Sequence, residues 1–311
     1  MSSHEEIDLS GVRAVPLRRR KNKVGLEDLS EIPKGKSFAH FWNSLPNQLA
    51  AKEIKVLVEA IRKARERKKP IIWFMGAHVI KVGLSPIIID LIKRGFITAI
   101  GLNGAGMIHD VELAMVGGTS EDVGEGIRDG VFGMAKETAE LLNGEVLELA
   151  GSGMGLGEAA GAAVERGRLP HRKHSILAAA YRSGIPCTVH IAIGTDIVHE
   201  HPSFDPAAAA TASYRDFKIM VRQIAGVSGG VIMNVGSSVI LPLIIEKGLS
   251  ISRNLGHDVK GFTGANLDFI RHYRPQLNPV QRALELGGTG ITLVGHHEIN
   301  VPLIYWALRA G

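Results

Sequence analysis

Short apolar runs alternate with amphipathic stretches along most of the chain. Five runs are largely β-branched and show no polar alternation, which is typical of strands buried on both faces of a parallel sheet. They are Ile71 to Met75, Ile97 to Leu102, Thr188 to Ile193, Val231 to Val235 and Ile291 to Val294. The expected helices are Lys52 to Lys69, Ser85 to Arg94, Asp110 to Val116, Ala207 to Ile224, Ser238 to Ser250 and Ile299 to Arg309. This alternation predicts an α/β fold with a doubly wound, mostly parallel sheet and helices on both faces.

Each predicted strand ends in a glycine-rich or polar loop. The loops are Gly76-Ala77-His78, Asn103-Gly104-Ala105-Gly106, Gly194-Thr195-Asp196, Gly236-Ser237-Ser238 and Gly295-His296-His297-Glu298. Ligands bind beyond the carboxyl ends of parallel strands, so the loops predict a site at one edge of the sheet. The second and fourth loops suit phosphate binding, because glycine lets backbone N–H groups reach an anion beside a helix start. The alternative is that their glycines only make tight turns.

The two ends of the predicted domain differ in organisation. Residues 1–36 lack periodicity and mix Gly, Pro and charged residues, which predicts an N-terminal basic arm. No linker interrupts residues 37–311, so we expect a single α/β domain of the nucleotide-binding type. The segment from Gly124 to Gly184 reads as helical and glycine-interrupted, and its run Gly151 to Gly157 is expected to form a flexible loop over the site edge.

The positive charge is concentrated near the N-terminus. Residues 1–70 hold 16 Lys and Arg against 9 Asp and Glu, although the whole chain carries a net charge of only +5. The run Arg18-Arg19-Arg20-Lys21 would suit a nucleic acid or an anionic surface. Because no nucleic-acid motif or interleaved aromatic residue accompanies it, a solvated arm or a subunit contact is the preferred interpretation.

Cysteine usage and hydropathy bear on the cellular setting. A single cysteine, Cys187, excludes an internal disulfide framework and favours a reducing compartment. No apolar run reaches about 18 residues without charge, and Met1 to Leu9 is acidic where a signal peptide would be basic and then apolar. We therefore expect a cytoplasmic protein with no membrane partner.

Histidine is the most conspicuous candidate for chemistry, with 13 copies. Several stand beside carboxylates, as general acid–base pairs or metal ligands do. Those at strand ends supply the candidate catalytic residues: His109, His199, Glu200, His297 and Glu298. No His-Glu-x-x-His or paired Cys-x-x-Cys motif is present, so a metal site is not favoured.

One stretch carries a family resemblance. Phe74 to Glu112, reading FMGAHVIKVGLSPIIIDLIKRGFITAIGLNGAGMIHDVE, resembles the corresponding region of deoxyhypusine synthases, especially the archaeal type. The order of elements continues to match between about residues 40 and 300. The resemblance implies a homotetrameric NAD enzyme with a doubly wound sheet that transfers a 4-aminobutyl group from spermidine to a lysine of a translation factor. It also implies that the dinucleotide contacts come from Gly76, Ala77, His78, Asn103, Gly104, Ala105, Gly106, Asp110, Asp196, Gly236, Ser237 and Ser238.

The chain departs from that family at its catalytic motifs. The family has a Gly-Gly-Gly segment leading into Lys-His-His and a later acidic stretch that carries an imine-forming lysine. Here Val235 to Pro242 contains no histidine, and Glu285 to Ile291 contains no lysine. A Schiff-base mechanism requires an amine nucleophile, so the family's chemistry does not transfer intact.

Three hypotheses follow from these observations. The first is a deoxyhypusine synthase-like enzyme that binds NAD or a related nucleotide and acts on a small substrate, with amines as one candidate class. The second is metal-assisted hydrolysis or isomerisation by histidines and carboxylates from the same loops, for instance His109, Asp110, His199, Glu200 and His297. The third is a nucleotide-binding or assembly module without catalysis. In every case we expect a homo-oligomer, with a tetramer implied by the resemblance.

Asp110 has two possible roles. It follows the Gly104-Ala105-Gly106 loop and is expected at a helix start, where its carboxylate would cap the helix or accept hydrogen bonds from a ribose hydroxyl or a substrate amine.

Overall fold

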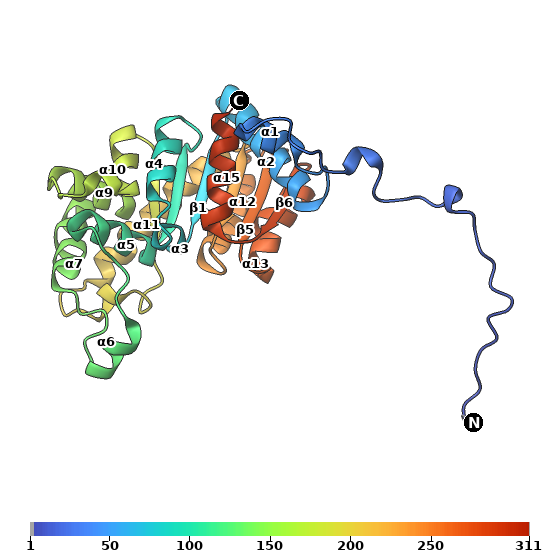
Figure 1. Ribbon diagram of the computed structural model, residues 1–311. Coiled ribbons are helices and arrows are strands. Elements are labelled where there is room, and N and C mark those ends of the chain that lie inside the picture. Colours follow the sequence, from blue (N-terminus) through green and yellow to red (C-terminus); the bar gives the residue numbers. More distant parts are fainter. Residues whose placement is uncertain (1–2, 311) are drawn as a thin grey trace.

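A six-stranded, entirely parallel sheet forms the centre of the computed structural model, which describes residues 3–310. The strand order is β3-β2-β1-β4-β5-β6, and helices lie on either side of the sheet (Figure 1). This confirms the predicted doubly wound α/β fold. The strands are β1 (Ile71–Met75), β2 (Ala99–Asn103), β3 (Cys187–His190), β4 (Val231–Val235), β5 (Thr263–Asp268) and β6 (Thr289–Val294).

The helices divide into long covering helices and short connecting ones. The helices are α1 (Phe38–Ser44), α2 (Leu49–Glu66), α3 (His78–Lys81), α4 (Ser85–Lys93), α5 (Gly104–Val116), α6 (Val123–Asp129), α7 (Lys136–Glu140), α8 (Val146–Gly151), α9 (Leu156–Arg166), α10 (Ile176–Ser183), α11 (Pro206–Ala225), α12 (Ile240–Asn254), α13 (Tyr273–Pro275), α14 (Arg282–Glu285) and α15 (His297–Arg309). Single turns occur at η1 (Leu17–Arg19), η2 (Leu26–Asp28), η3 (Leu141–Glu145), η4 (Arg172–His174), η5 (Ile197–Glu200) and η6 (Gln276–Gln281).

Side chains of β1 alternate between two hydrophobic cores. Ile71, Trp73 and Met75 pack into the core covered by α2, α4, α5 and α15, whereas Ile72 and Phe74 pack into the core formed with α11 and α12. All five residues are completely buried. The apolar run of β1 has no polar alternation because the strand is covered on both faces.

The order of the strands reverses between β1 and β4. From β1 the chain proceeds outward to β2 and β3, and it then returns to place β4 on the other side of β1. Met75 pairs with Val235 at the carboxyl ends of the two strands. In sheets of this kind, ligands bind in the crevice at such a reversal. The predicted site edge therefore corresponds to the carboxyl ends of the strands on either side of the β1–β4 pair.

The sequence analysis missed β5. Its sequence, Thr-Gly-Ala-Asn-Leu-Asp, lacks the continuous apolar run that predicted the other strands. Two features of the interior account for its composition. Gly264 lies so close to Pro279 that a Cβ would be 2.5 Å from the Pro279 carbonyl oxygen, and Asn266 accepts a buried hydrogen bond of 2.8 Å from Asn234 on β4.

Asp110 does not begin a helix, which corrects the expected start of α5. The helix begins at Gly104, and Asn103 caps it by accepting a 3.0 Å hydrogen bond from the Gly106 N–H. Asp110 lies within the helix and is fully buried. Its carboxylate accepts hydrogen bonds from Ser175 Oγ and from the backbone N–H groups of Ile176 and Leu177, at the start of α10. Asp110 therefore joins α5 to α10, and both of its carboxylate oxygens are bound by groups of the chain itself.

The Gly151 to Gly157 run does not cover the carboxyl edge as predicted. Gly157 packs against Cys187, the first residue of β3, where a Cβ would be 2.1 Å from the carbonyl oxygen. Asp216 of α11 accepts hydrogen bonds from the N–H groups of Gly157 (2.8 Å) and Val189 (2.7 Å). The glycines thus allow the start of α9 to pack against the outer edge of β3.

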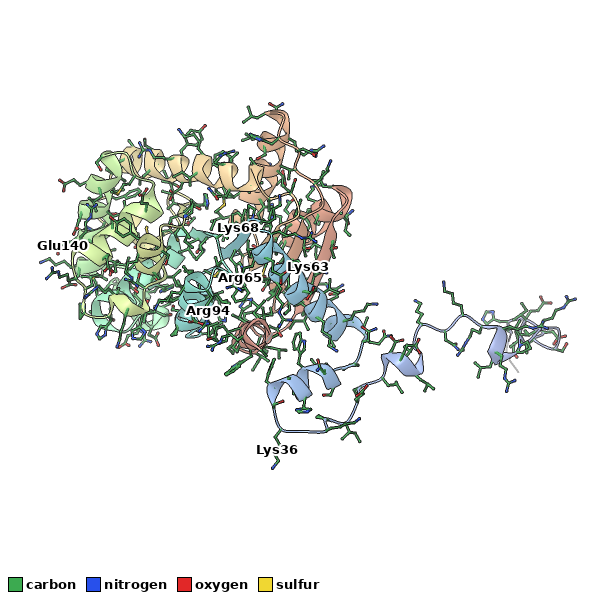
Figure 2. The ribbon with its side chains drawn as sticks, turned by 90° about the horizontal axis from the view of Figure 1, so that it is seen from above. Lys36, Lys63, Arg65, Lys68, Arg94 and Glu140 are labelled. Carbon is green, nitrogen blue, oxygen red and sulfur yellow. The ribbon has the colours of Figure 1, made fainter. Side chains whose placement is uncertain are left out.

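The N-terminal residues from 3 to 36 are extended and largely exposed, and the trace leaves the α/β domain (Figure 1). The positions of Met1, Ser2 and Gly311 lie outside the described residues. Basic residues continue onto the domain surface, where Lys63, Arg65 and Lys68 near the end of α2 lie near Arg94 after α4 (Figure 2). Among the described residues, no helix has the length and apolar character needed to span a bilayer.

The Asp110→Asn variant tests the buried helix junction. An asparagine offers one acceptor oxygen and places an NH₂ donor against donors of α10, so we expect the free energy of unfolding to fall by about 1–3 kcal/mol. Asp258→Asn, at an exposed position, is the control and should change stability by less than about 0.5 kcal/mol. Denaturant unfolding measures both, and an Asp110→Asn protein as stable as the unsubstituted protein would contradict this role.

Candidate functional site

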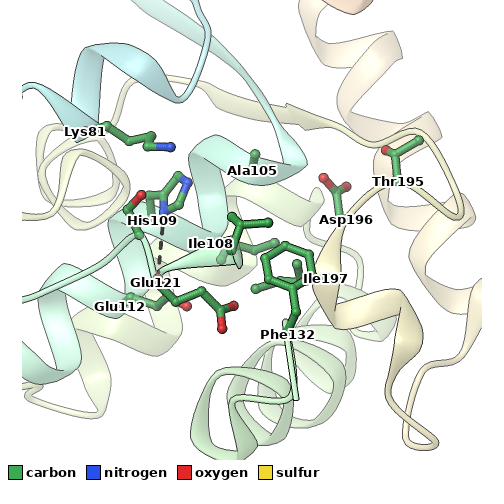
Figure 3. A pocket seen from close by; sticks show the side chains of 12 residues that line it. Lys81, Ala105, Ile108, His109, Glu112, Glu121, Phe132, Thr195, Asp196 and Ile197 are labelled. Atoms are coloured by element: carbon green, nitrogen blue, oxygen red, sulfur yellow. Dashed lines mark ion pairs between the residues drawn. The ribbon is translucent and has the colours of Figure 1, made fainter. Parts of the chain in front are cut away.

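A pocket of about 160 Å³ lies at the carboxyl edge of the sheet, beside the ends of β2 and β3. Its walls come from α3, the start of α5, the turn after β3 and the segment between α5 and α7. The lining residues are Lys81, Ala105, Ile108, His109, Glu112, Ser120, Glu121, Val123, Phe132, Thr195, Asp196 and Ile197. Figure 3 shows Lys81 and His109 on one side of this pocket and Asp196 on the other.

His109 belongs to a chain of hydrogen bonds that reaches a carboxylate. His109 Nδ1 lies 2.6 Å from Thr119 Oγ1, and the Thr119 hydroxyl donates to Glu112 Oε2. The carboxylate also accepts a 3.3 Å hydrogen bond from Thr138 Oγ1. Burial alone would raise the pKa of Glu112, but the nearby His109 ring and the hydrogen bonds from Thr119 and Thr138 outweigh it and lower that pKa below its usual value.

This chain of hydrogen bonds determines the histidine tautomer. The Thr119 hydroxyl has one proton, and because that proton points to Glu112, its oxygen can only accept from His109. Nδ1 of His109 must therefore carry a proton, which leaves the Nε2 lone pair free in the neutral ring. His109 is thereby arranged as a proton acceptor, with the Glu112 carboxylate 3.7 Å from Nδ1 to stabilise the charged form.

Asp196 supplies a second reactive group to the pocket. Its side chain is 9% exposed, and its Oδ2 has no hydrogen-bond partner among the described residues. Burial raises the pKa of Asp196 to about 6, although the Ala105 N–H donates to the carboxylate and opposes this shift. A buried carboxylate oxygen without a donor is a site at which a ligand hydroxyl or N–H group can bind.

The same carboxylate explains the glycine at the start of α5. A Cβ on Gly104 would be 1.8 Å from Asp196 Oδ2, so only glycine allows the turn after β3 to approach the helix. The positive end of α5 faces the Asp196 carboxylate and the Asn103 side-chain oxygen. The phosphate role that was expected for the Asn103 to Gly106 loop is therefore filled by groups of the chain itself.

His199 holds the turn that carries Asp196. Its Nδ1 accepts hydrogen bonds from the Gly194 N–H (3.1 Å) and the Asp196 N–H (3.2 Å), and its ring packs against Phe204. Burial lowers the pKa of His199, which favours the neutral ring. Glu200, the next residue, is exposed and does not line the pocket.

A second group of predicted residues gathers at the reversal between β1 and β4. The backbones of Gly76 and Gly236 are in contact, and a Cβ on Gly76 would be 2.1 Å from the Gly236 carbonyl oxygen. Gly236 has φ +69° and packs on His297, where its own Cβ would be 2.7 Å from Cε1. The rings of His78 and His297 both contact Phe269, with centroid distances of 4.8 Å.

His297 is the first residue of α15 and is fully buried. Its Nε2 lies 3.1 Å from the Leu267 carbonyl oxygen and donates to it, so Nδ1 is unprotonated, and Nδ1 has no partner among residues 3–310. Burial lowers the pKa of His297 and keeps the ring neutral. Glu298 is exposed and pairs with His296 at 3.5 Å, on the solvent side of this group.

The Gly236-Ser237-Ser238 loop leads into α12, and this start of a helix is more open than that of α5. Val239, the N-cap residue of α12, makes no side-chain capping hydrogen bond, and the first turn contains no acidic residue. Ser237 is buried, and its hydroxyl accepts a 3.4 Å hydrogen bond from the Leu241 N–H. Ser238 is partly exposed at the edge. A phosphate fits this loop better than it fits the loop before α5.

Three of the twelve residues that line the pocket, Ala105, His109 and Asp196, were candidates in the sequence analysis. Thr119, Glu121 and Phe132 belong to a segment rich in glycine and acidic residues that has no helical or strand periodicity, so nothing in the sequence connected them with His109. Lys81 follows a predicted loop by three residues and is the one lysine among the lining residues. Within residues 3–310, no three His, Cys, Asp or Glu side chains are grouped to hold a metal ion.

Comparison with known proteins identifies the fold. No protein-family model matches the chain, and no curated protein matches its sequence. Among solved structures, a deoxyhypusine synthase candidate from Entamoeba histolytica superposes with a TM-score of 0.56 and 12% identity, over 91% of this chain and 96% of that chain. A LOR/SDH protein candidate from Methanococcus maripaludis S2 gives a TM-score of 0.52 and 17% identity, over 85% and 70%.

A further neighbour was solved with a dinucleotide. AgrE, in a ternary complex with ornithine and NAD+, gives a TM-score of 0.53 and 16% identity over 86% of this chain. The similarity spans 34% of the AgrE chain, so this protein corresponds to about a third of it. These neighbours share the α/β fold at low sequence identity.

The Gly76→Ala variant tests the contact at the strand reversal. The added Cβ would strike the Gly236 backbone, which cannot rotate away, and we expect a loss of at least about 1–3 kcal/mol in the free energy of unfolding. The control is Gly144→Ala, where nothing lies within 4 Å of the new atom and a helical alanine should be neutral or slightly stabilising. Equal stability of the two variants would show that the close approach is relaxed in solution.

The tautomer of His109 can be measured directly. We expect the ¹⁵N chemical shifts of His109, assigned by comparison with His109→Gln, to show a protonated Nδ1 and an unprotonated Nε2 in the neutral ring. Thr119→Val removes the acceptor and should shift the ring toward the tautomer protonated on Nε2, while the exposed His257 should not change. Protonation on Nε2 in the unsubstituted protein would contradict the proposed hydrogen-bond chain.

Proposed function

We propose that this protein is an enzyme that binds NAD or a related nucleotide at the carboxyl edge of the sheet and acts on a small substrate, with His109 as general base. The observation that carries the proposal is the buried Oδ2 of Asp196, which shares the pocket with His109 and Lys81. This oxygen has no hydrogen-bond partner among the described residues, and its ion-pair neighbour, His199 Nε2, lies 3.9 Å away. In dinucleotide-binding sheets an acidic residue accepts hydrogen bonds from the ribose hydroxyls. The AgrE complex with NAD+ supports such a ligand for this fold.

The residues of the pocket fit the chemical parts of a nucleotide. Asp196 would accept from a ribose hydroxyl, and the Lys81 ammonium would attract a phosphate. Ile108, Phe132 and Ile197 provide apolar surface for a ring. At the strand reversal, the open start of α12 with Ser237 and Ser238 offers a second place for phosphate oxygens.

The side chains around the pocket could move a proton during a reaction. When bound, NAD would supply a nicotinamide ring that exchanges hydride with a substrate. His109 Nε2 would accept the proton that leaves the substrate, and Thr119 and Glu112 hold the ring in the required tautomer. The Glu112 carboxylate stabilises the resulting imidazolium and stays ionised, because its pKa is lowered.

Several parts of the first hypothesis belong to the proposal as well. We propose a small-molecule substrate, a homo-oligomeric assembly and a cytoplasmic setting. Transfer of an aminobutyl group to a protein lysine would need an amine nucleophile, and Lys81 is the one lysine among the residues lining the pocket. A protein that binds a nucleotide without turnover would instead correspond to the non-catalytic module.

Calorimetric titration with NAD tests the cofactor. Loss of the Asp196 carboxylate in Asp196→Asn removes a charged hydrogen-bond acceptor, so affinity should fall by about 1.5–3 kcal/mol, or roughly 10- to 100-fold. The Asp258→Asn variant, exposed and outside the pocket, should bind like the unsubstituted protein. Absence of binding at millimolar NAD would contradict the cofactor assignment.

The pH dependence of NAD affinity provides an independent check. The pKa of Asp196 is raised to about 6, so its carboxylate is ionised above that pH and becomes protonated as the pH falls through it. We expect affinity to weaken between about pH 7.5 and pH 5, and this dependence should be reduced in Asp196→Asn. A pH-independent affinity in the unsubstituted protein would separate Asp196 from the ligand.

A further inference from the structure

A second cavity, of about 370 Å³, adjoins the candidate site on the other side of Lys81. It lies between the turn from α3 to α4, the end of α5 and the η4 turn. Its lining residues are Ile80, Lys81, Gly83, Ser85, Pro86, Leu113, Gly117, Thr119 and His174. Lys81 lines both cavities, and Thr119 connects the second cavity to His109 by its hydrogen bond.

The α4 helix begins at this second cavity with its positive end uncapped. The helix has nine residues, Leu84 at its N-cap offers no side-chain acceptor, and the first turn contains no acidic residue. Pro86 in that turn has no N–H, and the Ile87 N–H donates to the Leu84 carbonyl oxygen, so the Ser85 end of the helix is the part open to a ligand. Asn103, Ser175 and Asp205, by contrast, cap α5, α10 and α11 with side-chain oxygens. The start of α4 therefore presents a partial positive charge that no side chain of the helix neutralises.

Ser85 provides an independent indication of a ligand. Its side chain is only 3% exposed, it lines the cavity, and its Oγ has no hydrogen-bond partner among the described residues. The large majority of buried side-chain polar atoms have a hydrogen-bond partner, either in the protein or in ordered water. An acceptor atom of a ligand in the cavity would supply the partner that the Ser85 hydroxyl lacks.

The ionisable residues that line the second cavity are all basic residue types. Lys81 and His174 are both exposed at its rim, and none of its lining residues is Asp or Glu. The neighbouring pocket differs, because Glu112, Glu121 and Asp196 line it together with Lys81. A ligand of the second cavity would meet a cation, a hydroxyl donor and a helix start.

We propose that this cavity binds a phosphate-type oxyanion through Ser85 Oγ, the start of α4 and Lys81. The oxyanion has two possible sources, which are free phosphate and a phosphate group of a nucleotide held in the adjoining pocket. Because Lys81 lines both cavities, an anion bound here would also hold its ammonium beside His109. The proposal is independent of NAD binding, since inorganic phosphate alone can test it.

The test is calorimetric titration of the full-length protein with inorganic phosphate in a phosphate-free buffer. We expect saturable binding that is weakened about 10- to 100-fold in Ser85→Ala, the usual effect of a hydrogen bond to a charged group. Lys81→Met changes an exposed position and should weaken binding without disturbing the core. Equal melting temperatures of the variants in the absence of phosphate confirm that they are folded.

Two matched controls locate the anion. Lys93→Met removes an exposed lysine at the far end of the same helix, and Ser152→Ala removes an exposed hydroxyl that lines neither cavity. Both should bind phosphate like the unsubstituted protein. Unchanged binding in Ser85→Ala and Lys81→Met, or an equal loss of binding in Ser152→Ala, overturns the proposal.

A competition experiment distinguishes the two sources of phosphate. If NAD displaces inorganic phosphate, the cavity holds a phosphate group of the nucleotide, and if both bind together, it is a separate anion site. Phosphate binding without NAD binding would support this proposal and contradict the cofactor assignment. NAD binding in a protein that does not bind inorganic phosphate would support the cofactor assignment and contradict the proposed anion site.

Discussion

The contact between Gly76 and Gly236 is the constraint on which the rest of the edge depends. The two residues follow neighbouring strands at the reversal of the sheet, and their backbones are too close to admit a Cβ. This contact fixes the position of α3, which begins two residues after Gly76 and carries His78 and Lys81. Since Lys81 lines the candidate pocket, the packing of two glycines places a charged group beside His109.

Glycine at a strand end has more than one physical meaning, and the structure separates them. Gly104 makes room for the Asp196 carboxylate, and Gly76 makes room for a neighbouring backbone. Neither needs a ligand to explain it. The two ligands that we propose rest instead on polar atoms that have no hydrogen-bond partner among the described residues, Asp196 Oδ2 in one cavity and Ser85 Oγ in the next.

The sequence predicted the bounds of two strands, β1 and β4, in which every residue is buried. The bounds of β1 and β4 match their apolar runs, because both strands are buried on both faces. The β5 strand did not follow this rule, since its glycine and asparagine serve contacts with Pro279 and Asn234. In the site, His109 and Asp196 were predictable from their places after strands. Thr119 was not, because its role depends on a non-periodic segment that folds back over α5.

Asp110 and His109 show why adjacency in sequence does not define a site. They are consecutive residues of one helix, so their side chains point in different directions. His109 faces the pocket and joins a polar network with Thr119 and Glu112, whereas Asp110 is buried against the start of α10. The α5 helix therefore contributes His109 to the candidate pocket and Asp110 to the packing of the domain.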